Sequence, residues 1–214
     1  MQPDSTERSS SLVAIVTGGT SGLGAAITVR LRERGLTVVT VSRRDEADIS
    51  GDASREETVQ RAVSHADSLG TITLLVNCAG LGVFGGAGSY VEADVREVLD
   101  ANLVSMILFC DELFPRFTRD GGTIVNILST AALTAKPGES VYCAAKWGAR
   151  GYTDVLRLEA KGTKARVLAV SPGGMQTPFW DHEREGFMDP HEIARIIVEA
   201  LEAKVNVSQL VIER

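Results

Sequence analysis

A tyrosine and a lysine in the second half of the chain have the types and spacing needed to move a proton. Tyr142 and Lys146 are four residues apart in a segment predicted to be helical, which puts both side chains on one face. A phenol is poorly poised for proton transfer at neutral pH, but a neighbouring ammonium favours the phenolate and lowers its pKa. This spacing is expected by chance about 0.07 times in a chain with this many tyrosines and lysines, so the pair alone is only suggestive.

A glycine-rich stretch near the N-terminus has the spacing of a phosphate-binding turn, GxxxGxG. Its glycines permit a tight turn, and free N–H groups at the start of the following helix bind a pyrophosphate. Such turns also occur as simple strand-to-helix connections, but the place of this one after a buried first strand favours the phosphate-binding interpretation. The residues predicted to face a dinucleotide here are Gly18, Thr20, Ser21, Gly22, Leu23 and Gly24.

Apolar runs that fit strands alternate with segments that fit helices along most of the chain. Strands are predicted at 12–16, 37–41, 72–76, 123–128, 166–170 and 210–212. Helices are predicted over 23–35, 54–69, 92–114, 141–160 and from about 190 to 201, and Pro115 is expected to close or kink the third. This alternation predicts an α/β fold with a doubly wound parallel sheet. We assign residues 1–11 to a polar lead and 12–214 to a single domain.

The composition argues against several classes of function. The net charge is −6 and no basic run is present, so no nucleic-acid partner is expected. No apolar run reaches the ~20 residues that span a bilayer, and the polar N-terminus does not read as a signal peptide. We therefore expect a cytoplasmic protein without a membrane partner. The three cysteines and three histidines are scattered, which predicts reduced thiols and no metal site.

Several motifs, in order, resemble those of the short-chain dehydrogenase/reductase family. The turn at residues 17–24 is similar to the family's TGxxxGxG, and residues 77–80 match its NNAG strand end with one change, Cys78. Tyr142 and Lys146 match its YxxxK. Ser129 lies thirteen residues before Tyr142, where the family carries a serine, and Asn102 falls where the family has an asparagine. The resemblance covers about residues 12–178 and implies a Rossmann fold in a shortened member of the family.

The resemblance implies hydride transfer between a nicotinamide cofactor and a small ketone, aldehyde or alcohol. Tyr142 is then the acid/base, and Ser129 hydrogen-bonds the substrate oxygen. Lys146 holds the nicotinamide ribose, and Asn102 holds a water that passes protons to Lys146. Two alternative functions on the same fold remain open. One is a sensor that binds NADP without turnover, which would be expected to lack the tyrosine or lysine. The other is an isomerase or dehydratase, which usually carries a larger substrate domain.

The end of the second predicted strand bears on the choice of cofactor. An NAD-binding domain places a carboxylate there for the adenosine ribose, whereas this chain has Ser42, Arg43 and Arg44. Guanidinium groups pair with the 2′-phosphate of NADP, so we predict NADP, with Arg43 as the better candidate. The alternative interpretation is that Arg43 and Arg44 belong to a solvated loop and do not bind the cofactor. Asp48 and Ile49 resemble the family's adenine-contacting pair, and they follow Arg43 too closely for the usual crossover helix, which we expect to be deleted.

Further contacts follow from the resemblance. The remaining residues predicted to bind the cofactor are Asn77, Ala79, Gly80, Pro172, Gly173 and Thr177, the last three at the nicotinamide carboxamide.

The predicted wall of the substrate pocket is formed by Phe84, Leu133, Phe179 and Trp180. The mixed-charge stretch 181–185 is interpreted as a solvated turn. A short lid and a short C-terminal end predict an open site that tolerates varied carbonyl compounds. Relatives pair their long helices, so a homodimer or homotetramer is expected.

Overall fold

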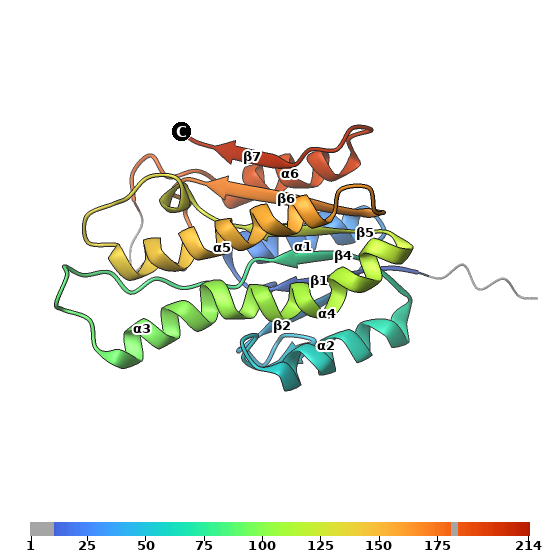
Figure 1. Cartoon of the computed structure of the whole chain (residues 1–214), viewed down its shortest axis with the longest axis horizontal. Helices are drawn as coiled ribbons and strands as arrows, with labels where there is room; N and C mark the ends of the chain where they lie inside the picture. Colours follow the sequence, from blue (N-terminus) through green and yellow to red (C-terminus); the bar gives the residue numbers. More distant parts are fainter. Residues whose placement is uncertain (1–10, 181–183) are drawn as a thin grey trace, which may run out of the picture.

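The computed structural model describes residues 11–180 and 184–214 and contains one seven-stranded sheet, in the order β3-β2-β1-β4-β5-β6-β7 (Figure 1). All neighbouring strands are parallel. The strands are β1 (Leu12–Thr17), β2 (Thr37–Ser42), β3 (Ile49–Ser50), β4 (Thr71–Asn77), β5 (Gly122–Ile127), β6 (Ala165–Pro172) and β7 (Gln209–Ile212). The helices are α1 (Gly22–Glu33), α2 (Glu56–Leu69), α3 (Glu92–Leu99), α4 (Ser105–Asp120), α5 (Ser140–Glu159) and α6 (Pro190–Glu202). Residues 1–10 of the predicted polar lead lie outside the described residues.

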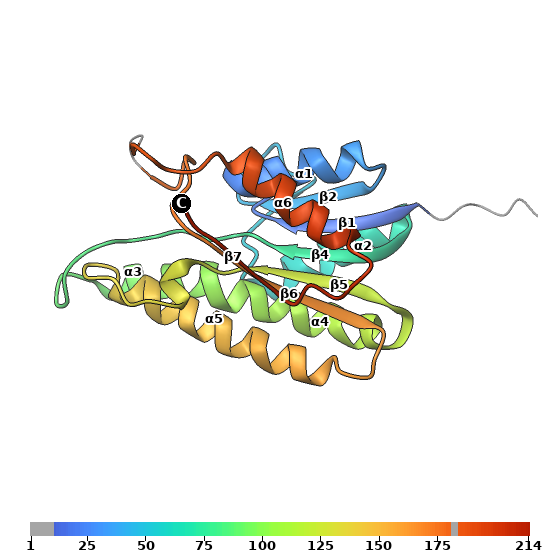
Figure 2. The ribbon, with the colours of Figure 1, turned by 90° about the horizontal axis from the view of Figure 1, so that it is seen from above.

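Helices cover both faces of the sheet, which confirms the predicted doubly wound fold. One face packs against α2, α4 and α5, and its core includes Phe109, Phe117 and Leu156. The other face packs against α1 and α6 through residues such as Ile27 and Ile197. Figure 2, seen from above, shows α1 and α6 on one side of the strands and α4 and α5 on the other. Strands buried on both faces explain why their sequences are continuous apolar runs.

The connection from β2 to β3 contains no helix, as expected from the sequence. Residues 43–48 pass directly from the end of β2 to the start of β3, and the two strands still pair in parallel. Asp48 secures this short connection: one carboxylate oxygen accepts hydrogen bonds from the N–H and the hydroxyl of Thr40, at 2.8 and 2.7 Å. The Asp48 N–H donates to the Thr40 hydroxyl in return, at 3.0 Å. The side chain predicted to contact adenine is therefore already engaged within the protein.

The predicted helix over residues 92–114 is divided and longer than expected. A five-residue π-helical segment, η1 (Asp100–Val104), separates α3 from α4. Of the two expected effects of Pro115, closing the helix is wrong, because α4 runs on to Asp120, and a kink stays a prediction. Pro115 lies on the exposed side, whereas Leu113 and Phe117 on either side of it are buried. The packing of that apolar stripe outweighs the loss of one backbone hydrogen bond at the proline.

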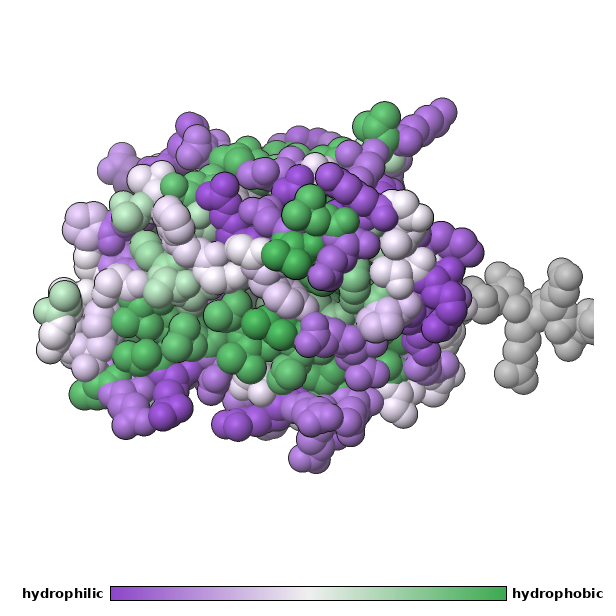
Figure 3. Space-filling view, viewed as in Figure 1, coloured by the Kyte–Doolittle hydropathy of each residue, from purple (hydrophilic) through white to green (hydrophobic). Residues whose placement is uncertain are grey.

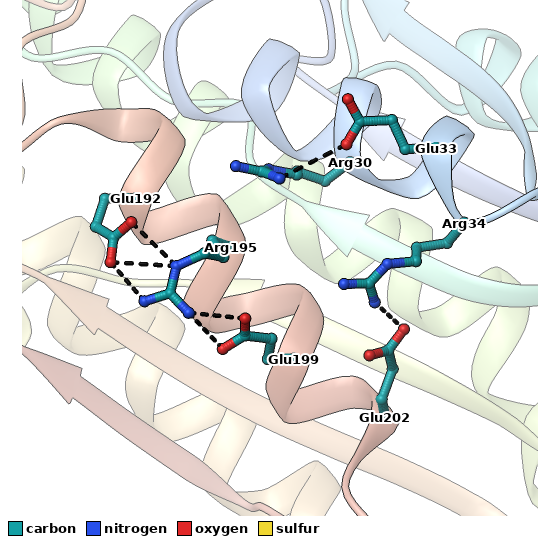
Figure 4. Close-up of polar contacts among 7 residues, drawn as sticks. All are labelled: Arg30, Glu33, Arg34, Glu192, Arg195, Glu199 and Glu202. Atoms are coloured by element: carbon teal, nitrogen blue, oxygen red, sulfur yellow. Dashed lines mark hydrogen bonds and ion pairs between the residues drawn. The ribbon is translucent and has the colours of Figure 1, made fainter.

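Helix α6 packs beside α1 on one face of the sheet. Arg34, just after α1, forms an ion pair with Glu202 at the end of α6 (Figure 4). Arg195 is paired with Glu192 and Glu199 along the outer side of α6. These exposed pairs contribute little each, and the buried stripe of Ile193, Ile197 and their neighbours supplies most of the packing. Across the described residues, no helix is both long and apolar enough to cross a membrane.

Candidate active site

A cavity of about 540 Å³ opens at the carboxyl ends of the central strands. The glycine-rich turn after β1, the ends of β4 and β5, the start of α5 and the segment after β6 form its walls. In a parallel sheet these loops meet at one edge, which is where such folds bind ligands. Of the residues singled out in the sequence, those that line the cavity are Gly18, Ser21, Gly22, Leu23, Gly24, Arg44, Gly80, Asn102, Ser129, Tyr142, Lys146, Pro172, Gly173, Thr177, Phe179 and Trp180.

Tyr142 and Lys146 lie on the first turns of α5, and both are buried. The Lys146 ammonium donates a hydrogen bond to the carbonyl of Ile127 at 3.1 Å and lies 5.8 Å from the centroid of the Tyr142 ring. Ser129 follows β5, and its hydroxyl accepts a hydrogen bond from the Ala131 N–H at 3.1 Å. The Ser129 hydroxyl also lies near enough to the Tyr142 phenol to lower the pKa of that phenol. The phenol, the hydroxyl and the ammonium therefore meet in one place.

The electrostatics of the pair differ from the expectation that Lys146 lowers the pKa of Tyr142. Burial raises the pKa of Tyr142 above its ordinary value, and the nearby Ser129 hydroxyl offsets this only in part. Burial also lowers the pKa of Lys146 to about 8, because charge is costly away from water. At neutral pH Lys146 is still mostly protonated and Tyr142 is a neutral phenol. In the protein without cofactor, Tyr142 therefore stays protonated and can donate a proton.

Asn102 lies in η1, where the widened turn directs its side chain into the site. Its amide Nδ2 donates to the carbonyls of Leu81 and Val98, at 2.7 and 2.9 Å. Its Oδ1 is buried and has no hydrogen-bond partner among the described residues. Gly80 separates this oxygen from Lys146: a Cβ at position 80 would lie 2.7 Å from the Asn102 oxygen and 3.8 Å from the Lys146 nitrogen. Asn102 therefore presents an unused acceptor beside the lysine ammonium.

The glycine-rich turn brings the backbone close to the start of α1. Gly18 has φ of +68°, a conformation that favours glycine. A Cβ on Gly24 would lie 2.2 Å from the Gly18 carbonyl oxygen, so only glycine fits there. Ser21 precedes α1 without a side-chain cap, and the first-turn residues Gly22, Leu23 and Gly24 line the cavity. The first N–H groups of a helix have no partner within it, so this end of the cavity suits an anion.

The two arginines after β2 have different surroundings. Arg44 lines the cavity, and its backbone N–H donates to the Ser42 hydroxyl at 3.1 Å. Ser42 also accepts a hydrogen bond from Thr20 at 2.9 Å, which ties the turn to the end of β2. Arg43 points elsewhere and pairs with Glu97 of α3 at 3.0 Å. The geometry places Arg44, rather than Arg43, at the wall of the cavity.

Several predicted cofactor residues are not part of the cavity wall: Thr20, Ser42, Arg43, Asp48, Ile49, Asn77 and Ala79. Asn77 instead donates to the Asn126 side chain at 2.9 Å in the interior of the sheet. The Ala79 N–H donates to the Thr17 hydroxyl at 3.1 Å, which fixes the chain as it leaves β4. Asn77 and Ala79 therefore hold the end of β4, from which Gly80 reaches the cavity.

At the other end of the cavity, aromatic rings cluster around Tyr142. Phe84 packs edge-on against Tyr142, with ring centroids 5.7 Å apart, and stacks on Trp180 at 5.2 Å. Phe179 also contacts Tyr142 at 5.7 Å. Of the four side chains predicted to form the substrate wall, Phe179 and Trp180 line the cavity, Phe84 packs behind them, and Leu133 does not take part.

Some residues of the cavity wall were not identified in the sequence. They include Cys78, Lys136, Glu139, Arg184, Phe187 and Arg214. Cys78 stands within the NNAG-like motif, and burial raises the pKa of its thiol to about 12, so the thiol is neutral. Arg184 belongs to the stretch 181–185 interpreted as a solvated turn, of which residues 181–183 lie outside the described residues. Trp180 lies only four residues before it, so the pair was visible in the sequence, but the mixed charge of the stretch favoured a solvated turn.

The structure describes all three cysteines and two of the three histidines. Cys78, Cys110 and Cys143 are free thiols. Residues 11–180 and 184–214 contain no group of histidine, cysteine and acidic side chains that could hold a metal ion. His182 lies outside this part of the chain.

Known proteins resemble this chain both in sequence and in fold. Residues 12–187 match the sequence family described as short chain dehydrogenase. The chain is 30% identical to carbonyl reductase family member 4 of Danio rerio, over 94% of this chain and 96% of that protein. A short-chain dehydrogenase/reductase from Vibrio parahaemolyticus superposes with a TM-score of 0.83 at 28% identity, covering 94% of this chain and 96% of the other. A short-chain dehydrogenase from Burkholderia cenocepacia in complex with NADP gives 0.84 at 27% identity, covering 96% and 89%.

Proposed function

The chain belongs to the short-chain dehydrogenase family of oxidoreductases, and on that premise we propose that it reduces a ketone or aldehyde to an alcohol with NADPH. The observation that carries the proposal is the meeting of Tyr142, Ser129, Lys146 and the unused oxygen of Asn102 at one end of a cavity whose other end suits a phosphate. A carbonyl reductase from Danio rerio is among the similar proteins, which supports the same class of substrate.

In this proposal the protein supplies orientation and a proton. Bound NADPH supplies the hydride to the carbonyl carbon. The Ser129 and Tyr142 hydroxyls hold the substrate oxygen, on which negative charge develops, and Tyr142 gives it a proton. The raised pKa of Tyr142 keeps the phenol protonated until that charge appears. Lys146 would hold the nicotinamide ribose, and a water on the Asn102 Oδ1 would return a proton through Lys146. Pro172, Gly173 and Thr177, which line the cavity, would hold the carboxamide of the nicotinamide.

The test is steady consumption of NADPH by the wild-type protein with a panel of ketones and aldehydes, followed by its absorbance. We expect turnover, with the alcohol formed in an amount equal to the NADPH consumed. The rival sensor function predicts NADPH binding without consumption. A rival isomerase or dehydratase, which oxidises its substrate only transiently, predicts an isomerised or dehydrated product without net oxidation of NADPH.

We propose NADP rather than NAD because Arg44 lines the cavity beyond the glycine-rich turn, where a 2′-phosphate would lie. The Burkholderia cenocepacia relative, solved with NADP, supports this choice. A guanidinium pairs with a phosphate through charge-assisted hydrogen bonds, each worth about 1.5–3 kcal/mol. Both arginines have an exposed acidic partner, Glu97 for Arg43 at 3.0 Å and Glu46 for Arg44 at 3.5 Å. The position of Arg44 at the cavity wall, which Arg43 does not share, is therefore what favours Arg44 as the phosphate partner.

Replacing Arg44 by alanine is expected to raise the Kd of NADPH about 10- to 100-fold and to leave the Kd of NADH nearly unchanged. Arg43→Ala is the matched control, since it removes the same charge from the neighbouring position and should change both values less than threefold. Titration of each variant with both cofactors by fluorescence checks this. A larger loss of NADPH affinity in Arg43→Ala than in Arg44→Ala would reverse the assignment.

We further propose a cytoplasmic homodimer or homotetramer that acts on a small-molecule carbonyl compound. Figure 3 shows apolar side chains gathered on the face formed by α4 and α5. Trp147, Val155 and Leu158 of α5 are each at least half exposed in the single chain. A cluster of large apolar side chains on one face is typical of a protein interface, and a second copy of the same face would cover it.

A further inference from the structure

Two arginine side chains at the substrate end of the cavity have no role in the proposed chemistry. Arg184 lies between β6 and α6, Arg214 follows β7, and both line the cavity. Among the ion pairs and side-chain hydrogen bonds of the described residues, neither guanidinium has an acceptor. Both residues are exposed, so water solvates their N–H donors in the free protein. A guanidinium carries five such donors, so two of them at the wall of one cavity offer an anion a set of donors that water would yield to it.

Aromatic rings hold both guanidinium groups in position. The Arg184 Cζ lies 4.1 Å from the centroid of the Trp180 ring, and the Arg214 Cζ lies 5.2 Å from the centroid of Phe187. The two rings contact each other, with centroids 5.5 Å apart. Stacking occupies the flat face of a guanidinium and leaves its N–H edge free. The rings therefore order the two positive charges without neutralising them.

These charges lie at the substrate end rather than at the proposed phosphate sites of the cofactor. Arg214 follows β7, the edge strand opposite to the side of the sheet where Arg44 follows β2. Five strand spacings of about 4.8 Å put these two strands roughly 24 Å apart. Trp180, on which Arg184 stacks, contacts Phe84, and Phe84 contacts Tyr142. The aromatic contacts thus connect Arg184 to the proposed catalytic tyrosine.

The charge of the cavity is opposite to that of the chain. The chain as a whole has a net charge of −6. The cavity wall has Glu139 as its one acidic side chain among the described residues, against five basic ones: Arg44, Lys136, Lys146, Arg184 and Arg214. A positive cavity in an acidic protein attracts anionic ligands and repels cations.

We propose that Arg184 and Arg214 bind an oxoanion on the substrate, so that the preferred substrates are ketones or aldehydes carrying a carboxylate or phosphate several bonds from the carbonyl. Planar carboxylates and phosphates match the paired donors of a guanidinium, which gives such groups an advantage over neutral ones. The inference rests on the proposed carbonyl reduction and adds its substrate class. This substrate class is narrower than the varied carbonyl compounds that the sequence predicted the site to accept.

The experiment compares keto acids with their methyl esters, beginning with levulinate and methyl levulinate and extending the chain between the ketone and the carboxylate. Each pair shares the reducible carbonyl and differs in the negative charge. The variants are Arg184→Gln, which keeps a flat polar side chain near Trp180, and Arg214→Ala. Arg195→Ala is the matched control, because it removes one arginine from the outer side of α6, away from the cavity (Figure 4).

We expect the wild type to prefer the best acid to its ester in kcat/KM, and each cavity variant to lower that preference about 10- to 100-fold. Activity on the esters and the Kd of NADPH should stay within threefold of wild type, and Arg195→Ala should change nothing. An unchanged acid-to-ester ratio in both variants would overturn the proposal. So would a large rise in the Kd of NADPH, because the two arginines would then bind the cofactor's phosphates.

A binding measurement separates this inference from the proposed function. In a Trp147→Phe background, Trp180 is the remaining tryptophan and reports on Arg184 through its fluorescence. Levulinate or a longer keto acid, added to the protein saturated with NADP⁺, should give a saturable change that the ester lacks and that Arg184→Gln abolishes. This result supports the anion site even if no carbonyl compound is turned over. Equal responses to acid and ester, or none to either, contradict it.

Discussion

Replacing Tyr142 by phenylalanine is expected to lower kcat at least about 1,000-fold while leaving the Kd of NADPH within threefold of wild type. The substitution removes the phenol that would protonate the substrate oxygen, and positioned acid/base groups typically contribute 10²- to 10⁴-fold. It keeps the ring, which is buried and contacts Phe84 and Phe179, so the fold should be retained. Single-turnover consumption of NADPH and a fluorescence titration of the same preparation measure the two effects separately.

Tyr152→Phe is the matched control for this experiment. Tyr152 lies on the same helix, and its hydroxyl donates to Asp111 at 2.6 Å, outside the cavity. Its loss should leave kcat within a factor of three. A Tyr142→Phe protein that keeps more than a tenth of wild-type kcat would show that another group protonates the substrate. A variant that also loses NADPH binding would point to a structural role.

Replacing Gly24 by alanine is expected to weaken NADPH binding more than 100-fold and to destabilise the protein without cofactor by about 1–3 kcal/mol. The added Cβ would lie 2.2 Å from the Gly18 carbonyl oxygen, a backbone atom that cannot rotate away. The turn must therefore open, which moves the first N–H groups of α1 from the place where a pyrophosphate would bind. Cofactor titration and urea unfolding measure the two quantities.

Gly151→Ala is the control for a glycine-to-alanine change inside a helix. Position 151 lies in α5, and nothing lies within 4 Å of a Cβ built there. Alanine should stabilise the protein by up to about 1 kcal/mol, because glycine is the poorer helix former. Binding of NADPH to Gly24→Ala within threefold of wild type would mean that the turn adjusts to a methyl group, and the phosphate site would then need another location.

The fold and much of the site could be predicted because their signals are local in the sequence. The GxxxGxG turn occupies seven residues, and Tyr142 and Lys146 are neighbours on one helix face, so spacing alone brings their side chains together. Buried parallel strands are continuous apolar runs, and each predicted strand has a counterpart in the sheet. The absence of a helix between β2 and β3 followed from simple length, since six residues separate them.

What the sequence could not predict depends on how side chains come to lie in the folded chain. Arg43 and Arg44 are equivalent as neighbours in a sequence, and it is Glu97 of α3 that draws one of them from the cavity. Arg184 belongs to a mixed-charge stretch typical of a solvated turn, and only its stacking on Trp180 places it at the site. The pKa of Tyr142 was expected to fall because of Lys146, whereas its burial, which comes from tertiary packing, raises it.

The π-helical segment η1 has a consequence for how this chain tolerates insertions and deletions. The Ser105 N–H bonds to the carbonyl of Asp100, five residues back, so this turn holds one residue more than an α-helical turn. Removing one residue from η1 would therefore let α3 and α4 join as one α-helix, with Val98 and Phe109 still facing the core. Asn102 lies within the turn and would lose the position from which its oxygen faces the site. A single-residue deletion there should spare the fold and impair the site.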